Sequence, residues 1–296
     1  MTYLKSLLIS TLDQSDVDVF IIGGGINGLG VALDCQLRGL KTVLIDQHDF
    51  SSGTSSRSSK LIHGGLRYLK DFKFKLVFQS LLERHLLLKN APHLVKPLPF
   101  VIPIYDRSGF SSFMIRLGLI IYDLLGCFRS LPHFKFLSRS DVLSMQPDID
   151  PNGLKSGLLY YDAKMNDARI CIELAKQASL HGAFLFNYTS LVSIKKNDHE
   201  ISAVEIKCHL TNQVIRFNTS IIVNATGPWS DFTQNKLYRS TLNKVKLSKG
   251  VHFITKKLRS QQAYLFTSPI DERIFFMIPF YDKTMVGTTD TIYRGD

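Results

Sequence analysis

The stretch Val17-Asp-Val-Phe-Ile-Ile-Gly-Gly-Gly-Ile-Asn-Gly-Leu-Gly30 decides the fold of this chain. Its apolar first half, rich in β-branched and aromatic residues, predicts a buried strand, and the pattern Gly23-x-Gly25-x-x-Gly28 predicts a tight turn into a helix. In such a unit the first glycine permits the turn, the second lets the backbone approach a pyrophosphate, and the third lets the helix lie close to the strand. The anion binds at the positive N-terminal end of the helix. The stretch therefore predicts a dinucleotide-phosphate site.

The residues that follow fit the same unit. Residues 31–37 are predicted to be helical, Gly39 ends that helix, and residues 41–45 form a second apolar strand that ends at Asp46. An acid at this position can accept hydrogen bonds from ribose hydroxyls. The alternative is a glycine-rich turn that binds nothing, and it requires strand, glycines, helix and acid to fall in register by chance.

The composition bounds the class of protein. With 296 residues, 45% hydrophobic and 21% charged, the chain is long enough for two interleaved domains of ordinary globular composition. Its 36 Lys and Arg against 25 Asp and Glu give a net charge of +11, which favours anionic partners such as anionic lipid or a phosphorylated small molecule. The basic residues are spread along the chain and form no run interleaved with aromatics, so we expect no nucleic-acid partner.

The cysteines and the N-terminus give further expectations. Cys35, Cys127, Cys171 and Cys208 lie far apart without the spacing of a metal site, so we expect buried thiols of a reducing compartment and no metal. Residues 1–12 lack the small-residue cleavage site of a signal peptide. Their leucines fall near one helical face, which either packs on the domain or touches a membrane, and packing is the favoured interpretation.

Two further segments carry unusual residue combinations. Residues 49–60 are rich in serine, which by composition alone is typical of a linker. The string that follows, Leu61-Ile-His-Gly-Gly-Leu-Arg-Tyr-Leu69, places an imidazole, a guanidinium and a phenol around two glycines. Later in the chain, an apolar strand at 220–223 leads to Ala225-Thr-Gly227, small residues that leave room for a cofactor against the backbone. Both segments are therefore candidates for the site.

The remaining periodicity predicts a mixed set of elements. Helices are predicted at 72–89, 110–128, 138–146 and 167–182, and strands at 157–161, 183–187, 191–195, 201–209, 214–217, 245–255, 263–267, 273–279 and 284–287. Residues 191–217 are predicted to form an antiparallel meander, and residues 245–287 a second antiparallel sheet. The prolines at 92–103 predict an extended, edge-like segment. Arg116 and Asp123 interrupt helix 110–128, which favours a buried or membrane-surface helix over a membrane-spanning one.

Together these motifs resemble the FAD-dependent, aerobic-type glycerol-3-phosphate dehydrogenase family. The segments that carry the resemblance are 22–34 with 38–39, 54–69, 91–94, 114–116, 224–229, 249–252 and 287–290. The resemblance implies an α/β fold, in which a Rossmann-like FAD-binding domain of the glutathione-reductase or D-amino-acid-oxidase type is interleaved with an antiparallel-sheet substrate domain. We expect the FAD-binding domain at 1–90 and 160–238, and the substrate or cap domain at 91–159 and 239–296.

The resemblance also implies an activity and a location. Members oxidise sn-glycerol 3-phosphate to dihydroxyacetone phosphate, with hydride transfer from C2 to flavin N5 and electrons passed to a membrane quinone. We therefore expect a cytoplasmic protein that is peripheral on the inner face of the cytoplasmic membrane. The net charge of +11 is compatible with an anionic membrane surface and an anionic substrate.

Individual roles follow from the resemblance and from side-chain chemistry. The predicted cofactor-binding residues are Gly23, Gly25, Ile26, Asn27, Gly28, Asp46, Thr54, Ser55, Ser56, Ser59, Lys60, Gly64, Ala225, Thr226 and Gly227. Arg67 offers a planar fork of donors to the substrate phosphate, unless it is an ordinary surface arginine. His63 and His252 are the candidates to take the hydroxyl proton, although an isolated histidine is more often structural. His63 is favoured because it lies in the denser motif.

One departure from the family concerns length. Its members continue beyond residue 296 with a further substrate-phosphate arginine, a Gly-Gly-Lys return to the FAD and a helical C-terminal domain, so we expect a C-terminally truncated chain. Alternatives are an inactive remnant, one part of a split enzyme, and another FAD oxidase of this fold that acts on amines or amino acids. A nicotinamide dehydrogenase is disfavoured by the junction at 225–227. A homodimer and a complementing C-terminal polypeptide are the open partner hypotheses.

Overall fold

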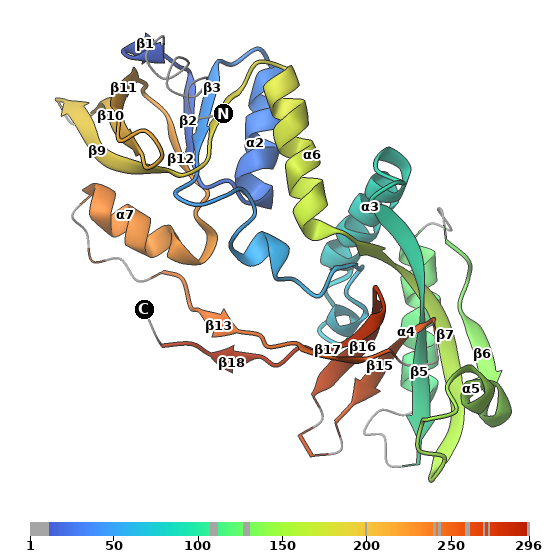
Figure 1. Ribbon diagram of the computed structural model, residues 1–296. Helices are drawn as coiled ribbons and strands as arrows, with labels where there is room; N and C mark the ends of the chain where they lie inside the picture. The colour runs from blue at the N-terminus through green and yellow to red at the C-terminus, as the bar shows by residue number, and fades with distance from the viewer. Residues whose placement is uncertain are drawn as a thin grey trace. The chain divides into compact units, whose positions relative to one another are not determined.

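The structure is a computed structural model, and it describes residues 12–106, 112–126, 131–198, 200–238, 241, 244–257, 261–268, 270–271 and 273–294. The chain divides into two compact units, each built from two separate segments. Unit 1 comprises Met1–Ser58 and Asp167–Leu247, and unit 2 comprises Ser59–Asn166 and Ser248–Asp296. Figure 1 shows both units, with most of their helices and strands labelled. The chain therefore passes between the units three times.

A parallel sheet forms the centre of unit 1. Its strand order is β12 (Ile222–Asn224), β2 (Val19–Ile22), β3 (Thr42–Ile45) and β8 (Phe184–Phe186). All three pairings are parallel. Both β2 and β3 are buried along their whole length, which is characteristic of a parallel sheet covered on both faces.

Different elements cover the two faces of this sheet. Because side chains alternate along a strand, Val19 and Ile21 pack with helices α2 (Ile26–Leu37) and α6 (Asp167–Leu180). Phe20 and Ile22 face the other way and pack with a second sheet. That sheet has the order β1 (Ser15–Asp16), β11 (Val214–Asn218), β10 (Glu200–Cys208) and β9 (Thr189–Asn197). The predicted Rossmann-like unit and its antiparallel meander are confirmed.

Unit 2 is built on one eight-stranded mixed sheet. Its main order is β14 (Phe253–Lys256), β17 (Lys283–Gly287), β16 (Ile274–Phe280), β15 (Ala263–Thr267), β5 (Val95–Tyr105), β7 (Leu154–Met165) and β4 (Leu61–Ile62), with β6 (Lys135–Ser138) also paired to β7. Helices α3 (Phe74–Asn90) and α4 (Ser112–Leu125) share a core with Phe100 and Leu158. Helix α5 (Arg139–Met145) packs through Val142 with Val101 and Leu159. A separate ribbon pairs β13 (Ser248–Lys249) with β18 (Thr291–Ile292). The predicted antiparallel second sheet is therefore part of a larger one.

Strand β5 corrects the prediction of an edge-like segment at 92–103. It lies between β7 and β15, and it pairs with β7 over its whole length. The prolines at 97, 99 and 103 occupy alternate positions, so their nitrogens, which carry no hydrogen, face the same side of the strand. On that side β15 pairs only with Phe100 and Val101. The prolines therefore fit an interior strand because the second neighbour is short.

The unit boundaries differ from the domain boundaries expected from the sequence. The first boundary falls between Ser58 and Ser59 instead of at residue 90, because Val77 and Leu81 of α3 pack in the core of unit 2. The second falls between Asn166 and Asp167 instead of at residue 160, because β7 runs to Met165. Residues 1–11 of the predicted leucine face at 1–12, Cys127 and the ends of helix 110–128 lie outside the described residues, and Leu12 packs against the core of unit 1. Cys171 and Cys208 are buried thiols, and Cys35 is half-buried.

Candidate active site

The glycine loop of unit 1 joins β2 to α2. Gly23 has a φ of +111°, and a Cβ at this position would lie 2.5 Å from the carbonyl oxygen of Ala225. A Cβ at Gly28 would lie 1.9 Å from the carbonyl oxygen of Gly23. No side chain fits at either position without moving backbone. The tight turn predicted at Gly23 and the close helix packing predicted at Gly28 are confirmed.

The N-cap residue of α2 makes no side-chain hydrogen bond to the first turn of the helix. Gly25 is the N-cap and supplies no side chain, and a Cβ there would meet only the Ser55 side chain, with Oγ at 3.0 Å. Ser55 Oγ accepts a hydrogen bond from the amide of Ile26 at 2.9 Å. In the part of the chain that the structure describes, the amides of Asn27 and Gly28 donate to no acceptor. These amides and the positive end of the helix suit an anion.

Asp46 lies at the end of β3 and holds the same loop. Its Oδ2 accepts a hydrogen bond from the Gly24 amide at 2.7 Å, and its Oδ1 accepts one from the His48 amide at 2.8 Å. A carboxylate has about four lone-pair sites, so two such bonds leave capacity for hydroxyl donors. Asp46 therefore stabilises the loop and can also accept from a ribose.

The junction at 225–227 lies against the glycine loop within unit 1. The Ala225 amide donates to the carbonyl oxygen of Ile22 at 2.8 Å, directly before Gly23. Thr226 Oγ1 donates to Asn224 Oδ1 at 2.7 Å, and Gly227 has a φ of +57° at the start of η3 (Gly227–Trp229). The two junctions that the sequence singled out are thus brought together by the pairing of β12 with β2.

The serine-rich segment is ordered and is shared between the units. Thr54–Ser56 forms the 3-10 turn η1 in unit 1, and Ser58 Oγ donates to Asp167 Oδ2 at 2.8 Å at the start of α6. Ser59, Lys60 and Gly64 belong to unit 2. Within unit 1 the structure therefore places Thr54, Ser55 and Ser56 in η1, with Ser55 bonded to the glycine loop, whereas Ser59, Lys60 and Gly64 lie in the second unit.

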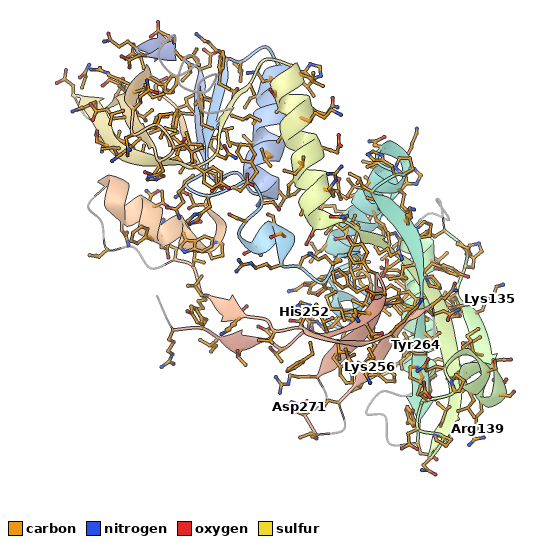
Figure 2. All side chains as sticks on the ribbon, in the orientation of Figure 1. Lys135, Arg139, His252, Lys256, Tyr264 and Asp271 are labelled. Atoms are coloured by element: carbon orange, nitrogen blue, oxygen red, sulfur yellow. The ribbon has the colours of Figure 1, made fainter. Side chains whose placement is uncertain are left out.

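His252 contacts a predicted cofactor residue of unit 2. Its Nε2 lies 2.9 Å from Ser59 Oγ, and the ring is half-buried just before β14 (Figure 2). Burial lowers the pKa of His252, because it disfavours the charged imidazolium, and the positive charge of Lys60 lowers it further. The imidazole is therefore neutral at neutral pH.

His63 and Arg67 are exposed in unit 2 at the end of β4. The His63 ring lies 6.5 Å from that of Phe276, centroid to centroid. Arg67 lies in η2 (Leu66–Leu69), with its guanidinium carbon 5.7 Å from the centre of the Tyr68 ring. None of the ion pairs formed by the described residues involves Arg67. Its charge is therefore available to an anionic ligand.

Comparison with known proteins identifies the family. Residues 18–296 match the family described as FAD dependent oxidoreductase. The chain belongs to that family. The alpha-glycerophosphate oxidase of Streptococcus pyogenes serotype M6 is 39% identical to this FAD dependent oxidoreductase over 300 residues, covering 99% of this chain and 49% of that protein. The aerobic glycerol-3-phosphate dehydrogenase of Staphylococcus haemolyticus is 37% identical over 298 residues, covering 100% and 54%.

A solved structure extends the comparison. The glycerol-3-phosphate dehydrogenase from Bacillus halodurans, complexed with FAD, superposes with a TM-score of 0.79 at 33% identity, covering 100% of this chain and 51% of that one. This FAD dependent oxidoreductase therefore spans about half the length of the relatives it matches.

The residues of unit 1 fit the cofactor of the family. The loop excludes any Cβ at Gly23 and Gly28, the start of α2 presents free amides, and Asp46 follows the neighbouring strand. These are the groups that bind the pyrophosphate and the ribose of a dinucleotide. The residues of unit 1 that would offer these groups to the cofactor are Gly23, Gly25, Ile26, Asn27, Gly28, Asp46, Ser55 and the segment 225–227.

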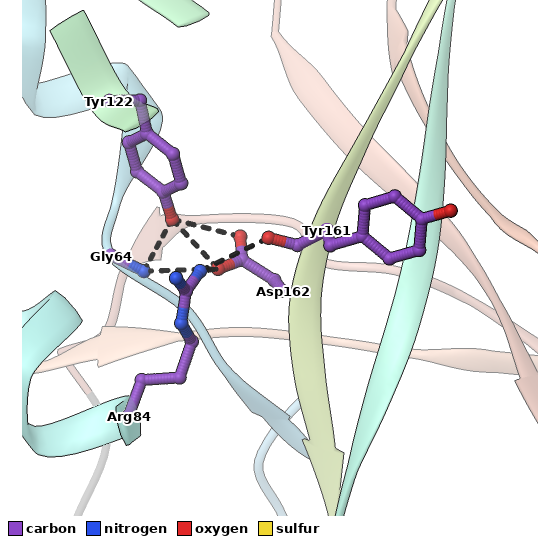
Figure 3. A network of polar contacts seen from close by, with 5 residues as sticks. All are labelled: Gly64, Arg84, Tyr122, Tyr161 and Asp162. Atoms are coloured by element: carbon purple, nitrogen blue, oxygen red, sulfur yellow. Dashed lines mark hydrogen bonds and ion pairs between the residues drawn. The ribbon is translucent and has the colours of Figure 1, made fainter. Parts of the chain in front are cut away.

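This FAD dependent oxidoreductase also contains a buried polar cluster that was not predicted from the sequence. Figure 3 shows Arg84, Tyr122 and Asp162 around the backbone of Gly64, with all three side chains buried. Burial raises the pKa of Asp162, and the charge of Arg84 opposes that rise. A sequence signal did exist: Arg84 follows Val77 and Leu81 at helical spacing on the buried face of α3. A charge on an apolar face requires a buried partner.

Proposed function

We propose that the protein binds FAD and oxidises sn-glycerol 3-phosphate to dihydroxyacetone phosphate. The observation that carries this is Arg67: an exposed guanidinium without a described acidic partner, placed four residues after His63 in a chain of a FAD-dependent family. A phosphate ester requires such a fixed, planar cation. The names of the relatives from Streptococcus and Staphylococcus support the same substrate.

The chain's own residues supply binding and proton transfer. Arg67 binds the substrate phosphate through two parallel N–H donors and thereby fixes the three-carbon backbone. A histidine takes the proton of the C2 hydroxyl while the C2 hydride leaves. When bound, FAD supplies the hydride acceptor at flavin N5. The products are the ketone and a protonated histidine, which releases its proton to solvent.

His252 is the better supported candidate for the base, although the sequence alone favoured His63. Its lowered pKa keeps the ring neutral, and its hydrogen bond to Ser59 orients it. When Nε2 donates to Ser59 Oγ, Nδ1 carries the lone pair that accepts the proton. His63 is exposed and has no such partner in the described residues. Here His63 serves beside Arg67 as a substrate-orienting group.

The finer part of the proposal concerns the membrane. No helix in the described ranges is both long and apolar enough to cross a bilayer. Helix α4 nevertheless exposes a row of large apolar side chains: Phe113, Met114, Leu117, Ile120 and Leu124. It packs on α3 and η2. Between and at the start of these elements, Phe72 and Phe74 are also exposed, and they alternate with Lys73 and Lys75. We call these residues the apolar-basic surface.

The apolar-basic surface suits an anionic membrane. Phenylalanine and leucine side chains enter the headgroup region, and flanking lysines are attracted to anionic lipid. The protein would then be a cytoplasmic, peripheral protein on the inner face of the cytoplasmic membrane, with a membrane quinone as electron acceptor. The net charge of +11 is compatible with binding to an anionic membrane surface.

Two measurements test the proposed activity. The purified protein mixed with FAD should show flavin absorbance at about 450 nm. Glycerol 3-phosphate added without oxygen should bleach this absorbance. Arg67→Ala should raise KM for glycerol 3-phosphate by ~100-fold or more without changing FAD content, because a charge-assisted bidentate contact is lost. Arg139→Ala, an exposed arginine of the same unit, is the matched control.

Three results would contradict the proposal. Failure to retain flavin would show that this chain alone does not bind FAD. Bleaching by an amine or amino acid but not by glycerol 3-phosphate would indicate an oxidase of another substrate class. Unchanged kinetics in Arg67→Ala would remove Arg67 from the substrate site.

A further inference from the structure

The buried cluster of unit 2 forms one continuous chain of hydrogen bonds (Figure 3). The Gly64 amide donates to Tyr122 Oη at 2.7 Å, and Tyr122 Oη donates to the two carboxylate oxygens of Asp162 at 2.8 and 3.0 Å. Arg84 Nη1 donates to Asp162 Oδ1 and, at 3.1 Å, to the carbonyl oxygen of Tyr161. The cluster thus joins α3, α4 and β7 to a single backbone amide.

The direction of this chain is fixed. A backbone amide can only donate and an ionised carboxylate can only accept, so the Tyr122 hydroxyl must accept from Gly64 and donate to Asp162. Burial and the nearby carboxylate raise the pKa of Tyr122 well above its ordinary value, so the hydroxyl keeps its proton. Arg84 balances the charge of Asp162 inside the core. Tyr122 has no alternative orientation that satisfies both neighbours.

The amide held by this chain lies between the two proposed substrate residues. Strand β4 pairs with β7 only at Leu61 and Ile62, so the sheet ladder ends before His63. Gly64 follows, and its missing Cβ matters because that atom would lie 2.6 Å from Tyr122 Oη. Gly65 then turns the chain with a φ of +74° into η2, which carries Arg67. The cluster therefore replaces the strand ladder as the anchor of this segment.

We infer that Tyr122 and Asp162 are positioning residues that hold the segment 63–67 in its substrate-binding conformation. This inference rests on the proposed function, because it assigns glycerol 3-phosphate to Arg67. Arg84 supports the pair by neutralising Asp162. None of the three side chains is exposed to substrate: each is 5% exposed or less. They act through the backbone of Gly64.

Tyr122→Phe tests the inference, with Tyr160→Phe as a matched control. Tyr160 is buried in the same core and its ring packs against that of Tyr122, but among the described residues no hydrogen bond joins its hydroxyl to Gly64. Amide hydrogen exchange of the peptide spanning 61–69, in the full chain loaded with FAD, should quicken by ~5-fold or more in Tyr122→Phe and not in Tyr160→Phe. Calorimetry should show ~10-fold weaker binding of glycerol 3-phosphate in Tyr122→Phe alone.

Each result decides one claim. Unchanged exchange in Tyr122→Phe, or equal changes in both variants, would overturn the anchoring role. Faster exchange with unchanged glycerol 3-phosphate affinity would overturn the positioning role. If the unaltered protein binds no glycerol 3-phosphate, the proposed function fails and the substrate role fails with it, while the exchange result still decides the anchoring role.

Discussion

At the scale of single residues, two glycines of α2 differ in whether a side chain could replace them. Gly28 lies against backbone: an added Cβ would be 1.9 Å from the Gly23 carbonyl oxygen. Gly30 lies two positions later in the same helix, and a Cβ there would meet nothing within 4 Å. The motif spacing predicted the first of these, because the third glycine of the pattern allows the helix to approach the strand. No packing contact requires a glycine at position 30.

This contrast gives a paired prediction. Gly28→Ala should lower the free energy of unfolding by about 1–3 kcal/mol, because the helix must move off the strand, and it should abolish FAD retention. Gly30→Ala should raise it by about 0.5–1 kcal/mol, since alanine costs less backbone entropy in a helix. Urea unfolding followed by circular dichroism, together with flavin absorbance, checks both. Equal behaviour of the two variants would refute the assigned packing.

A second residue-scale prediction concerns the proton acceptor. A histidine with a lowered folded-state pKa is harder to protonate in the folded protein, so its contribution to stability is complete above the unfolded pKa and declines as pH falls below it. Lys60→Met should raise the pKa of His252, because a neighbouring positive charge is removed. The acid limb of kcat/KM should then move to higher pH.

NMR titration of the His252 ring measures this shift without turnover. Lys256 is an exposed lysine of β14, and Lys256→Met serves as the control that should leave the pKa of His252 unchanged. If Lys60→Met leaves the His252 titration unchanged, Lys60 is not the charge that lowers it. If the titration moves but the acid limb of kcat/KM does not, another group is the base.

At the scale of elements, local signals were sufficient wherever an element is defined by its own residues. The α6 helix was predictable from Asp167 at its start and Gly182 after its end, and the meander from alternation and turn residues. The position of β5 was not predictable, because its second neighbour, β15, lies more than a hundred and fifty residues away. Strand order is set by such long-range pairing and leaves little trace in local composition.

The apolar-basic surface supports an element-scale prediction. Phe72→Ser combined with Phe113→Ser should weaken binding to vesicles of phosphatidylcholine and phosphatidylglycerol by ~10-fold or more, because each exposed phenylalanine loses the gain from burial in lipid. Vesicle sedimentation measures the affinity. Leu180→Ser, at an exposed apolar residue of α6 in unit 1, should change nothing. Equal loss in the control, or none in the double variant, would disprove docking through this surface.

At the scale of the whole molecule, the division into two units was predictable in kind but not in position. The alternation of strand and helix near each end of unit 1 predicted a discontinuous Rossmann-like unit. The assignment of α3 depended on which core Val77 and Leu81 enter, and that is decided by packing with Phe100 and Leu158. The Arg84–Asp162 pair was missed for the same reason, since its partners come from helix and strand segments far apart in sequence.

A whole-molecule prediction concerns the cofactor as a stabiliser. FAD at about 100 times its Kd should raise the free energy of unfolding of the intact chain by about 2.7 kcal/mol, because it binds only the folded form. Differential scanning calorimetry with and without FAD measures this, and Gly28→Ala should remove the effect. A melting temperature that does not respond to FAD would show that this chain alone does not hold the cofactor.

The parallel sheet of unit 1 also constrains how the protein is made. Strands β2 and β3 leave the ribosome before the segment 59–166, whereas both strands that flank them, β8 and β12, come after it. Asn224 follows Ile45 by about 180 residues, which takes roughly 10 to 35 s at ordinary rates of translation. Until β8 emerges this buried pair of strands has two unpaired edges, and from then until β12 emerges it has one. The nascent chain should therefore depend on chaperones that shield those edges until the last strand of the sheet emerges.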